Sequence, residues 1–223
     1  MLFRSFEGFE SEIKVKMEEL LAGAGDVMKL VARNRIFLDR TVGVGVISQA
    51  DALSYGYTGP CLRATGLAYD LRVHAPYSGY EQYDFEIPTG INGDTHDRIM
   101  VRMAELMQSR SIVLQALEKL PDGPLNIDDH AVILPPKAEV YGSIEGVMNQ
   151  FKLIYEGIQV PAGEGYGFGE GANGELGYFC ISDGTGYAYR MKVRPPCFPI
   201  FSSYSFLVQG LIDRKSTRLN SSH

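Results

Sequence analysis

The sequence has few cysteines, and none of them is placed to hold a metal or an iron–sulfur cluster. Three occur in 223 residues, at Cys61, Cys180 and Cys197. An odd count at long spacings, without a C-x-x-C pair, fits neither a disulfide framework nor a structural zinc or iron–sulfur site. The histidines are scattered in unlike contexts, at positions 74, 96, 130 and 223. We therefore expect a chain that binds no metal of its own and works in a reducing, cytoplasmic environment.

Positive charge and long apolar runs are also scarce. Lys and Arg number 21 against 27 Asp and Glu, giving a formal net charge of -6, which disfavours nucleic-acid binding. No apolar run approaches the roughly 20 residues that a spanning helix needs. Glu7, Glu10 and Glu12 interrupt the region where a signal peptide would be apolar. The 45% hydrophobic content predicts a folded core in a chain that is soluble or peripheral to something else.

Four helices are predicted, three of them from the spacing of apolar residues and one from its cap. Residues 5–22 place apolar side chains at steps of three and four, and Gly23 and Gly25 are expected to stop this helix. Ser48, with Asp51 three residues later, predicts the cap of a brief helix ending near Gly56.

The longest predicted helix is capped by Asp94 and runs to about Leu120. Its apolar stripe is interrupted only by Arg110 and comprises Ile99, Met103, Leu106, Val113, Leu117 and Leu120. A loop containing prolines follows, from Pro121 to Pro136, and a further helix from about Ser143 to Gly157 is expected to pack with the long one in a bundle.

Strand patterns are concentrated after Val160. Glycines there separate three runs, which predicts an antiparallel meander over residues 165–195. In its last strand Tyr187, Tyr189, Met191 and Val193 alternate with basic residues, so the apolar face is expected to pack inward. Upstream, only 83–87 alternates as a half-buried strand should.

These patterns predict an α+β fold in one domain. A helix bundle over 1–157 is followed by a Gly-rich antiparallel β region over 158–213. The final stretch, 214–223, is abruptly polar and is expected to be non-native sequence.

Two motifs have a chemical and a structural interpretation. Gly169–Gly174 matches G-x-G-x-x-G, but a strand follows it where a dinucleotide site needs a helix, so a hairpin turn is favoured. His96 between Asp94 and Asp97 could support acid–base chemistry. Both carboxylates fall in the first turn of the long helix, however, where capping is favoured.

The arginines are assigned structural or docking roles. Arg63, between turn-forming glycines, is expected to pin a loop by pairing with a carboxylate such as Asp70 or Asp94, and Arg98 is grouped with the residues of the helix start. The last strand presents a basic stripe of alternating residues, formed by Arg190, Lys192 and Arg194. This basic stripe is either a solvated face or a docking face for an acidic partner or anionic lipid, and docking is the hypothesis to test.

A series of short motifs resembles one known family, the D subunits of bacterial respiratory NADH-quinone oxidoreductases (complex I). The matches extend over nearly all of residues 30–210. They include Asn34–Gly45, Asp51-Ala-Leu, Gly59-x-x-Leu-Arg63, Tyr69-Asp-Leu-Arg72, Pro76-Tyr77, Tyr83–Pro88, Asp97-Arg98, Phe151-Lys-Leu153, Ser182-Asp-Gly184, Tyr189-Arg190 and Arg194-x-Pro-x-Phe198. The identification therefore depends on coverage and not on one pattern.

The resemblance implies a peripheral subunit on the cytoplasmic side of the bacterial inner membrane. In that family the subunit and its iron–sulfur B partner form the chamber in which quinone is reduced by a proton-translocating complex. The [4Fe-4S] cluster lies in that adjacent subunit, FMN and NADH bind in distant subunits, and this chain is expected to bind no cofactor. The C subunit and the membrane-arm subunits are further expected partners. Arg194 and Phe198 are candidates to line the quinone chamber.

The same resemblance implies that the chain is a C-terminal fragment, because the family's headgroup His and Tyr lie upstream of Met1. Two alternatives remain at this point. The first is a large subunit of a membrane-bound [NiFe] hydrogenase, although its two C-x-x-C pairs are absent and Cys197 has no partner three residues away. The second is a structural assembly subunit of a related complex.

Overall fold

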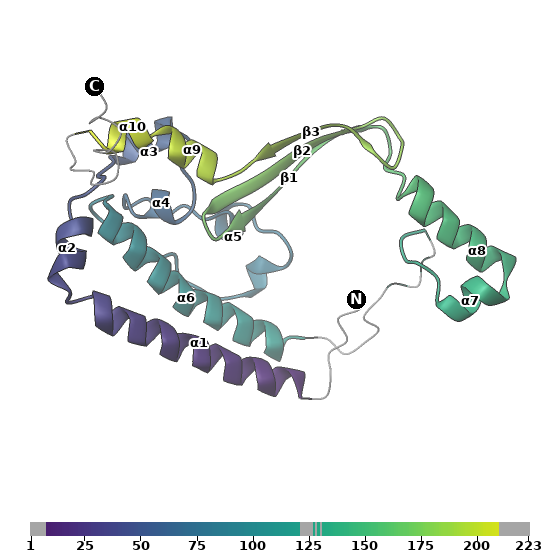
Figure 1. Cartoon of the computed structure of the whole chain (residues 1–223), viewed down its shortest axis with the longest axis horizontal. Coiled ribbons are helices and arrows are strands. Elements are labelled where there is room, and N and C mark those ends of the chain that lie inside the picture. Colours follow the sequence, from purple (N-terminus) through teal and green to yellow (C-terminus); the bar gives the residue numbers. More distant parts are fainter. Residues whose placement is uncertain (1–7, 121–126, 128, 130, 210–223) are drawn as a thin grey trace, which may run out of the picture. The chain divides into compact units, whose positions relative to one another are not determined.

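The computed structural model describes residues 8–120, 127, 129 and 131–209 (Figure 1). Contacts divide these residues into two compact units. The core unit comprises 8–120, 169–176 and 195–209, and the ribbon unit comprises the rest, up to 168 and over 177–194. The expected non-native tail, 214–223, and the first predicted helical residues, 5–7, lie outside the described residues, as does the Pro-Asp-Gly-Pro turn at 121–124. The expected boundary at residue 157 follows composition and stays a prediction.

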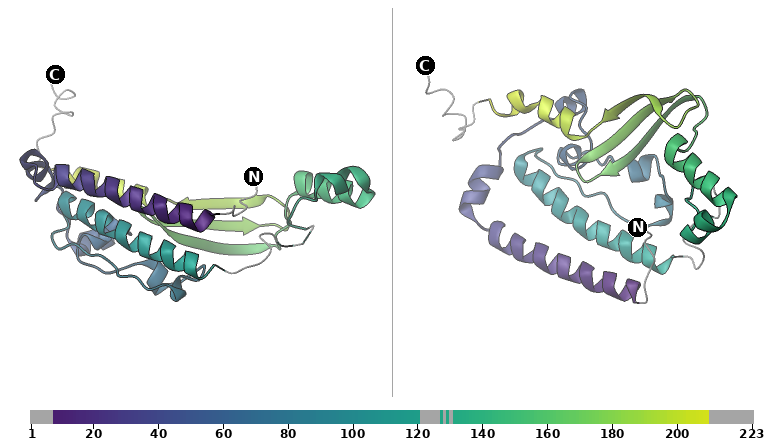
Figure 2. Two further views of the ribbon diagram at one scale, coloured as in Figure 1. Left: turned by 90° about the horizontal axis from the view of Figure 1, so that it is seen from below. Right: turned by 45° about the vertical axis from the view of Figure 1, so that its right-hand side comes forward.

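In the core unit, α1 (Phe9–Val31) lies beside α6 (Thr95–Glu118), as both figures show for the purple and teal helices (Figures 1 and 2). The expected stop at Gly23 and Gly25 is wrong. Neither glycine has a positive φ, and the helix continues to a cap at Ala32. An interior glycine costs a helix roughly 1 kcal/mol. Packing along α6 offsets such a cost, whereas a true stop needs a left-handed residue.

The long helix α6 begins where the sequence predicts, with the Asp94 side chain accepting from the Asp97 amide at 2.8 Å. Its buried positions agree only in part with the predicted stripe. Leu117 is buried as expected, but Val101 and Ile112 are buried outside the stripe, and Leu120 is exposed. The reason is that α6 contacts both α1 and α4, so that its burial is spread over two faces.

Short elements surround α6. The helix α2 (Arg35–Thr41) is capped by Asn34, and the predicted brief helix is α3 (Gln49–Ser54), capped by Ser48. The remaining short elements are α4 (Pro60–Arg63), α5 (Leu71–His74), the 3-10 turn η1 (Tyr80–Gln82), α9 (Cys197–Ser202) and α10 (Tyr204–Leu207).

The predicted strand at 83–87 is wrong. The segment is extended but joins no sheet, because α6 satisfies its amides. Asp84 donates to the side chain of Gln115 at 2.8 Å, and Glu86 donates to that of Gln108 at 3.1 Å.

The hydrophobic core lies around α3 and α4. Ile47, Ala52, Tyr57 and Leu62 are fully buried within it. The last helices close this core, because Ile200 and Leu207 pack on it, and the hydroxyls of Tyr57 and Ser203 are hydrogen-bonded.

In the ribbon unit, α7 (Lys137–Gly142) packs against α8 (Ile144–Phe151), which continues as a π-helical turn, Lys152–Glu156, and ends at Gly157. The predicted start near Ser143 is confirmed, and the structure shows that Ser143 caps the helix, since its hydroxyl accepts from the Gly146 amide. Within its own unit this helix packs against α7, to which a single residue joins it, and its expected packing with the long helix stays a prediction. Short connections make helices neighbours.

The predicted meander is confirmed as three strands in the order β1 (Gly163–Gly171), β2 (Gly174–Ser182) and β3 (Ala188–Arg194). Strands β2 and β3 are antiparallel, with Gly177 opposite Arg194. Helices and this sheet together confirm the α+β class.

One expectation about β3 is wrong. Tyr187 and Tyr189 are 75% exposed, and Met191 and Val193 are exposed as well, so the apolar face does not pack inward within this chain. Alternation marks a face that can be buried, but burial also needs a second layer.

Candidate functional site

The densest group of ionisable side chains is built around Arg63, the last residue of α4. Gly59 precedes this helix with φ 66, and Pro60 occupies its first position, so the turn is fixed locally. The packing of α4 beside α6 leaves the Arg63 side chain only 2% exposed. A buried guanidinium requires compensating charge.

Three carboxylates surround that guanidinium. Nε of Arg63 donates to Glu105 of α6 at 2.7 Å, and Nη1 donates to Glu170 of β1 at 2.9 Å. The same Nη1 lies 3.4 Å from Oδ2 of Asp70 and donates to the carbonyl of Tyr69. The side chains of Asp70 and Glu170 are 1% and 4% exposed, so the pairs are shielded from water.

A second arginine completes this charge cluster, which consists of Arg63, Asp70, Arg72, Glu105 and Glu170. Arg72 donates to Asp70 from Nε at 3.0 Å and from Nη2 at 2.7 Å, and its backbone amide donates to Oδ1 of Asp70 at 2.9 Å. Burial acts to raise the pKa of Asp70, but the hydrogen bonds from Arg72 and the charges of both arginines outweigh it and hold that pKa below its usual value.

Glu170 behaves in the opposite way. Burial raises the pKa of Glu170; the charge of Arg63 opposes this shift, and the charge of Asp70 adds to it. The backbone amide of Glu170 donates to the hydroxyl of Tyr77 at 2.7 Å, which anchors the end of β1.

The predicted hairpin over Gly169–Gly174 is confirmed and delivers Glu170 to the cluster. Two strands flank the turn, so the motif lacks the helix that a dinucleotide site needs. Gly174 has φ 129, and a Cβ on Gly174 or Gly59 would overlap the backbone of the other segment. The hydroxyl of Thr58 accepts from the Glu175 amide at 3.0 Å.

Asp94, Asp97 and Arg98 bind loops to the start of α6. Asp94 accepts from the Gly43 amide at 2.8 Å in addition to capping the helix. Arg98 donates from Nη2 to the carbonyls of Gly45 and Gly93. A role of these three residues in docking to a partner stays a prediction.

The carboxylate of Asp97 accepts from the Ile91 and Asn92 amides at 2.9 and 2.6 Å. Burial acts to raise the pKa of Asp97, but these amides outweigh it and lower that pKa. Asp94, His96 and Asp97 have potential metal-ligand atoms within 4.8 Å of one another. Their carboxylates already accept backbone amides, so the geometry is that of a capped helix start.

The remaining predicted residues lie on separate units. Arg190 and Lys192 are exposed on β3, and Arg194 ends that strand half-buried. Phe198 lies on α9 in the core unit and is 73% exposed.

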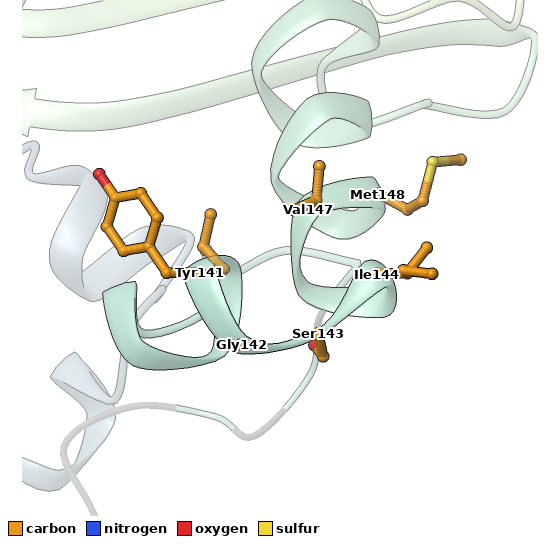
Figure 3. Close-up of a pocket in the computed structure, with 7 residues that line it drawn as sticks. Tyr141, Gly142, Ser143, Ile144, Val147 and Met148 are labelled. Atoms are coloured by element: carbon orange, nitrogen blue, oxygen red, sulfur yellow. The ribbon is translucent and has the colours of Figure 1, made fainter.

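An open apolar hollow of about 380 Å³ lies between α7 and α8, where Tyr141, Ile144, Val147 and Met148 line it (Figure 3). Within the described residues, no helix is both long and apolar enough to cross a membrane.

Comparison with known proteins identifies the family. A family described as "Respiratory-chain NADH dehydrogenase, 49 Kd subunit" matches residues 5–213. The chain belongs to this family. The match includes the charge cluster, the start of α6 and all three strands.

Individual relatives agree with this assignment. A D subunit of the NADH-quinone oxidoreductase of Sorangium cellulosum, the one numbered 1, is 50% identical over 205 residues, which is 92% of this chain and 51% of the relative. The D subunit from Myxococcus xanthus is 49% identical, covering 92% and 49%. The C/D subunit from Bdellovibrio bacteriovorus is 46% identical, covering 92% and 36%. The chain thus spans about half the length of the D subunits it matches, and their names favour the complex I family over the hydrogenase alternative.

Sequence reasoning found part of the charge cluster. It paired Arg63 with Asp70 or Asp94, and the structure shows Asp70, while Asp94 binds Gly43 and its own helix. Glu105 and Glu170 were missed, because they lie 42 and 107 residues from Arg63. Such separations leave no periodic signal in a single sequence.

Proposed function

We propose that this chain is part of a complex I subunit that forms the quinone-reduction chamber together with an iron–sulfur B partner. The observation that supports the proposal is the identity of about half of all aligned residues to relatives named as D subunits of NADH-quinone oxidoreductase, across 92% of the chain. The complex transfers electrons from NADH to quinone and translocates protons.

In this proposal the chain supplies protein surface, and other subunits supply the redox groups. FMN and the NADH site belong to distant subunits, and the terminal [4Fe-4S] cluster belongs to the adjacent one. Hydride and electron transfer depend on such groups, while protein binds, orients and tunes them. The isolated chain should therefore show no NADH oxidation or quinone reduction.

Arg194 and Phe198 are the proposed chamber residues. Phe198 presents an exposed ring on α9, which suits contact with an apolar quinone. Arg194 ends β3 at its pairing with Gly177 and offers guanidinium donors that suit a quinone carbonyl oxygen.

The basic stripe is proposed to dock. Arg190 and Lys192 are exposed, and their charge suits an acidic surface of a neighbouring subunit or anionic lipid phosphates. In this proposal the subunit lies at the cytoplasmic face of the inner membrane, next to the C subunit and the membrane arm.

The chamber assignment is tested in the full-length subunit within its purified complex. Phe198→Ala should raise the KM for quinone several-fold, because the ring contact is lost. NADH oxidation by a water-soluble artificial acceptor that takes electrons ahead of quinone should be unchanged. Phe206→Ala, on the exposed surface of α10, is the matched control.

A normal KM for quinone in Phe198→Ala would contradict the chamber role of that residue. Loss of complex assembly, with wild-type kinetics in whatever assembles, would instead favour the structural assembly subunit.

A further inference from the structure

The charge cluster contains more negative than positive groups. Arg63 and Arg72 supply two guanidinium groups, whereas Asp70, Glu105 and Glu170 supply three carboxylates. Full ionisation would leave one uncompensated negative charge. Burying such a charge is strongly unfavourable, and a group in this position takes up a proton or a cation.

The three carboxylates differ in how well their charge is compensated. Asp70 accepts three hydrogen bonds from Arg72 and also lies beside Arg63. Glu105 accepts from Nε of Arg63, and its side chain is partly exposed to water. Glu170 is almost fully buried, shares a single Nη1 of Arg63 with Asp70, and otherwise has only a backbone hydrogen bond from Leu71, which carries no net charge. Glu170 is therefore the carboxylate with the least compensation.

We propose that Glu170 is a proton-binding site: its carboxyl group holds a proton at pH values at which an exposed glutamate has lost it, and this proton makes the charge cluster neutral. The proton is taken from solvent, and the carboxylate with its negative charge becomes a neutral carboxylic acid. The protonated group still has a carbonyl oxygen that accepts the hydrogen bond from Nη1 of Arg63.

The groups facing Glu170 come from four places in the core unit. Arg63 approaches from α4, Asp70 and Arg72 from the start of α5, and Glu105 from α6 through its bond to Arg63. Tyr77 precedes η1 and contacts the Glu170 amide. These groups hold as many negative as positive charges around Glu170, so ionisation of Glu170 is what creates the excess.

Tyr77 is a neighbouring titratable group that does not change this count. Burial raises the pKa of Tyr77, so its hydroxyl remains neutral. His74 directs Nδ1 to the backbone carbonyl of Asp70 at 2.9 Å. Burial also raises the pKa of Glu170 itself, in agreement with the geometry.

Glu170 makes stability depend on pH with a definite sign. Below the ordinary value of 4.5 both folded and unfolded chains hold the proton, and the stabilising contribution is complete. Above it the unfolded chain releases the proton that the folded chain keeps, so this contribution declines as pH rises through the folded pKa. Asp70 has a lowered pKa, so its contribution to stability is complete above its ordinary value of 3.8 and is lost as the pH falls below that value.

The test uses the full chain labelled with ¹³C-glutamate, so that infrared spectra distinguish glutamic from aspartic acid. A glutamic-acid carbonyl band should persist at pH values above 4.5, the ordinary pKa of a glutamate, at which exposed glutamates have lost their proton. Glu170→Gln should lack this band. Glu164→Gln, exposed on the same strand, is the matched control and should retain it. Absence of the band from the parent chain, or its survival in Glu170→Gln, would overturn the proposal.

A second variant decides the matter if Glu170→Gln does not fold. Glu105→Gln removes one negative charge from Arg63 and leaves Glu170 in place. The band should then disappear at a lower pH than in the parent chain, because the surroundings of Glu170 have lost one negative charge. An unchanged midpoint would show that the band does not belong to the charge cluster.

Discussion

Arg63 and Arg190 are chemically identical side chains in opposite surroundings. Arg63 is buried among carboxylates that approach from separate parts of the chain. Arg190 is exposed on β3, in a stripe of like charges. A buried charge contributes to the stability of its own chain through partners whose loss leaves charges stranded, whereas an exposed charge contributes little. The first arginine therefore acts within the fold, and the second is available to a partner.

The largest expected effect comes from removing the centre of the charge cluster. Arg63→Ala leaves three carboxylates without their shared guanidinium and should destabilise the chain by roughly 3–5 kcal/mol. Denaturant unfolding measures this loss. Arg190→Ala is the matched control and should leave the midpoint unchanged. Equal midpoints for the two variants would remove the distinction between the buried and exposed arginines.

A smaller effect is expected where the hairpin meets α4. Gly174→Ala forces a Cβ against Thr58 at a residue with φ 129, and should cost about 1–3 kcal/mol. Gly165→Ala, on β1 with open space around it, should be nearly neutral. Unfolding midpoints of the two variants test the contrast, and a neutral Gly174→Ala would show that the hairpin tip is not tightly packed.

The smallest effect on stability is expected for the basic stripe. Replacing the exposed Arg190 and Lys192 together by Gln should leave unfolding of the chain nearly unchanged. In the full-length subunit the same change should reduce recovery of assembled complex on native gels and weaken the salt dependence of quinone reduction. Wild-type recovery with an unchanged salt profile would make the stripe ordinary solvated surface.

Features that depend on neighbours in sequence were predictable. The caps at Asp94 and Ser48, the helix start near Ser143 and the hairpin at Gly169–Gly174 all depend on residues within a few positions. The errors arose where tertiary contacts override a local pattern. Packing on α6 carries α1 through Gly23, and glutamines of α6 satisfy the amides near Asp84.

The candidate site follows the same rule. Asp70 could be proposed as a partner of Arg63 because it lies seven residues away, but no local pattern indicates which distant glutamate approaches a buried guanidinium. Burial of β3 could not be predicted either, since alternation describes a face and not the layer that would cover it.

The long separations within the charge cluster also determine when it can form. A ribosome releases Arg63 well before Glu105, and Glu170 follows 107 residues after Arg63. Until the hairpin has emerged, the guanidinium of Arg63 lacks its partner Glu170. The contact between Tyr57 and Ser203 spans 146 residues and comes later still. Contacts so far apart slow folding, because a large loop must close before any of them is gained. The core unit therefore matures only after the hairpin and Ser203 have been made, and a chain stalled before the hairpin would expose Arg63 and α4 as a surface on which chaperones can act.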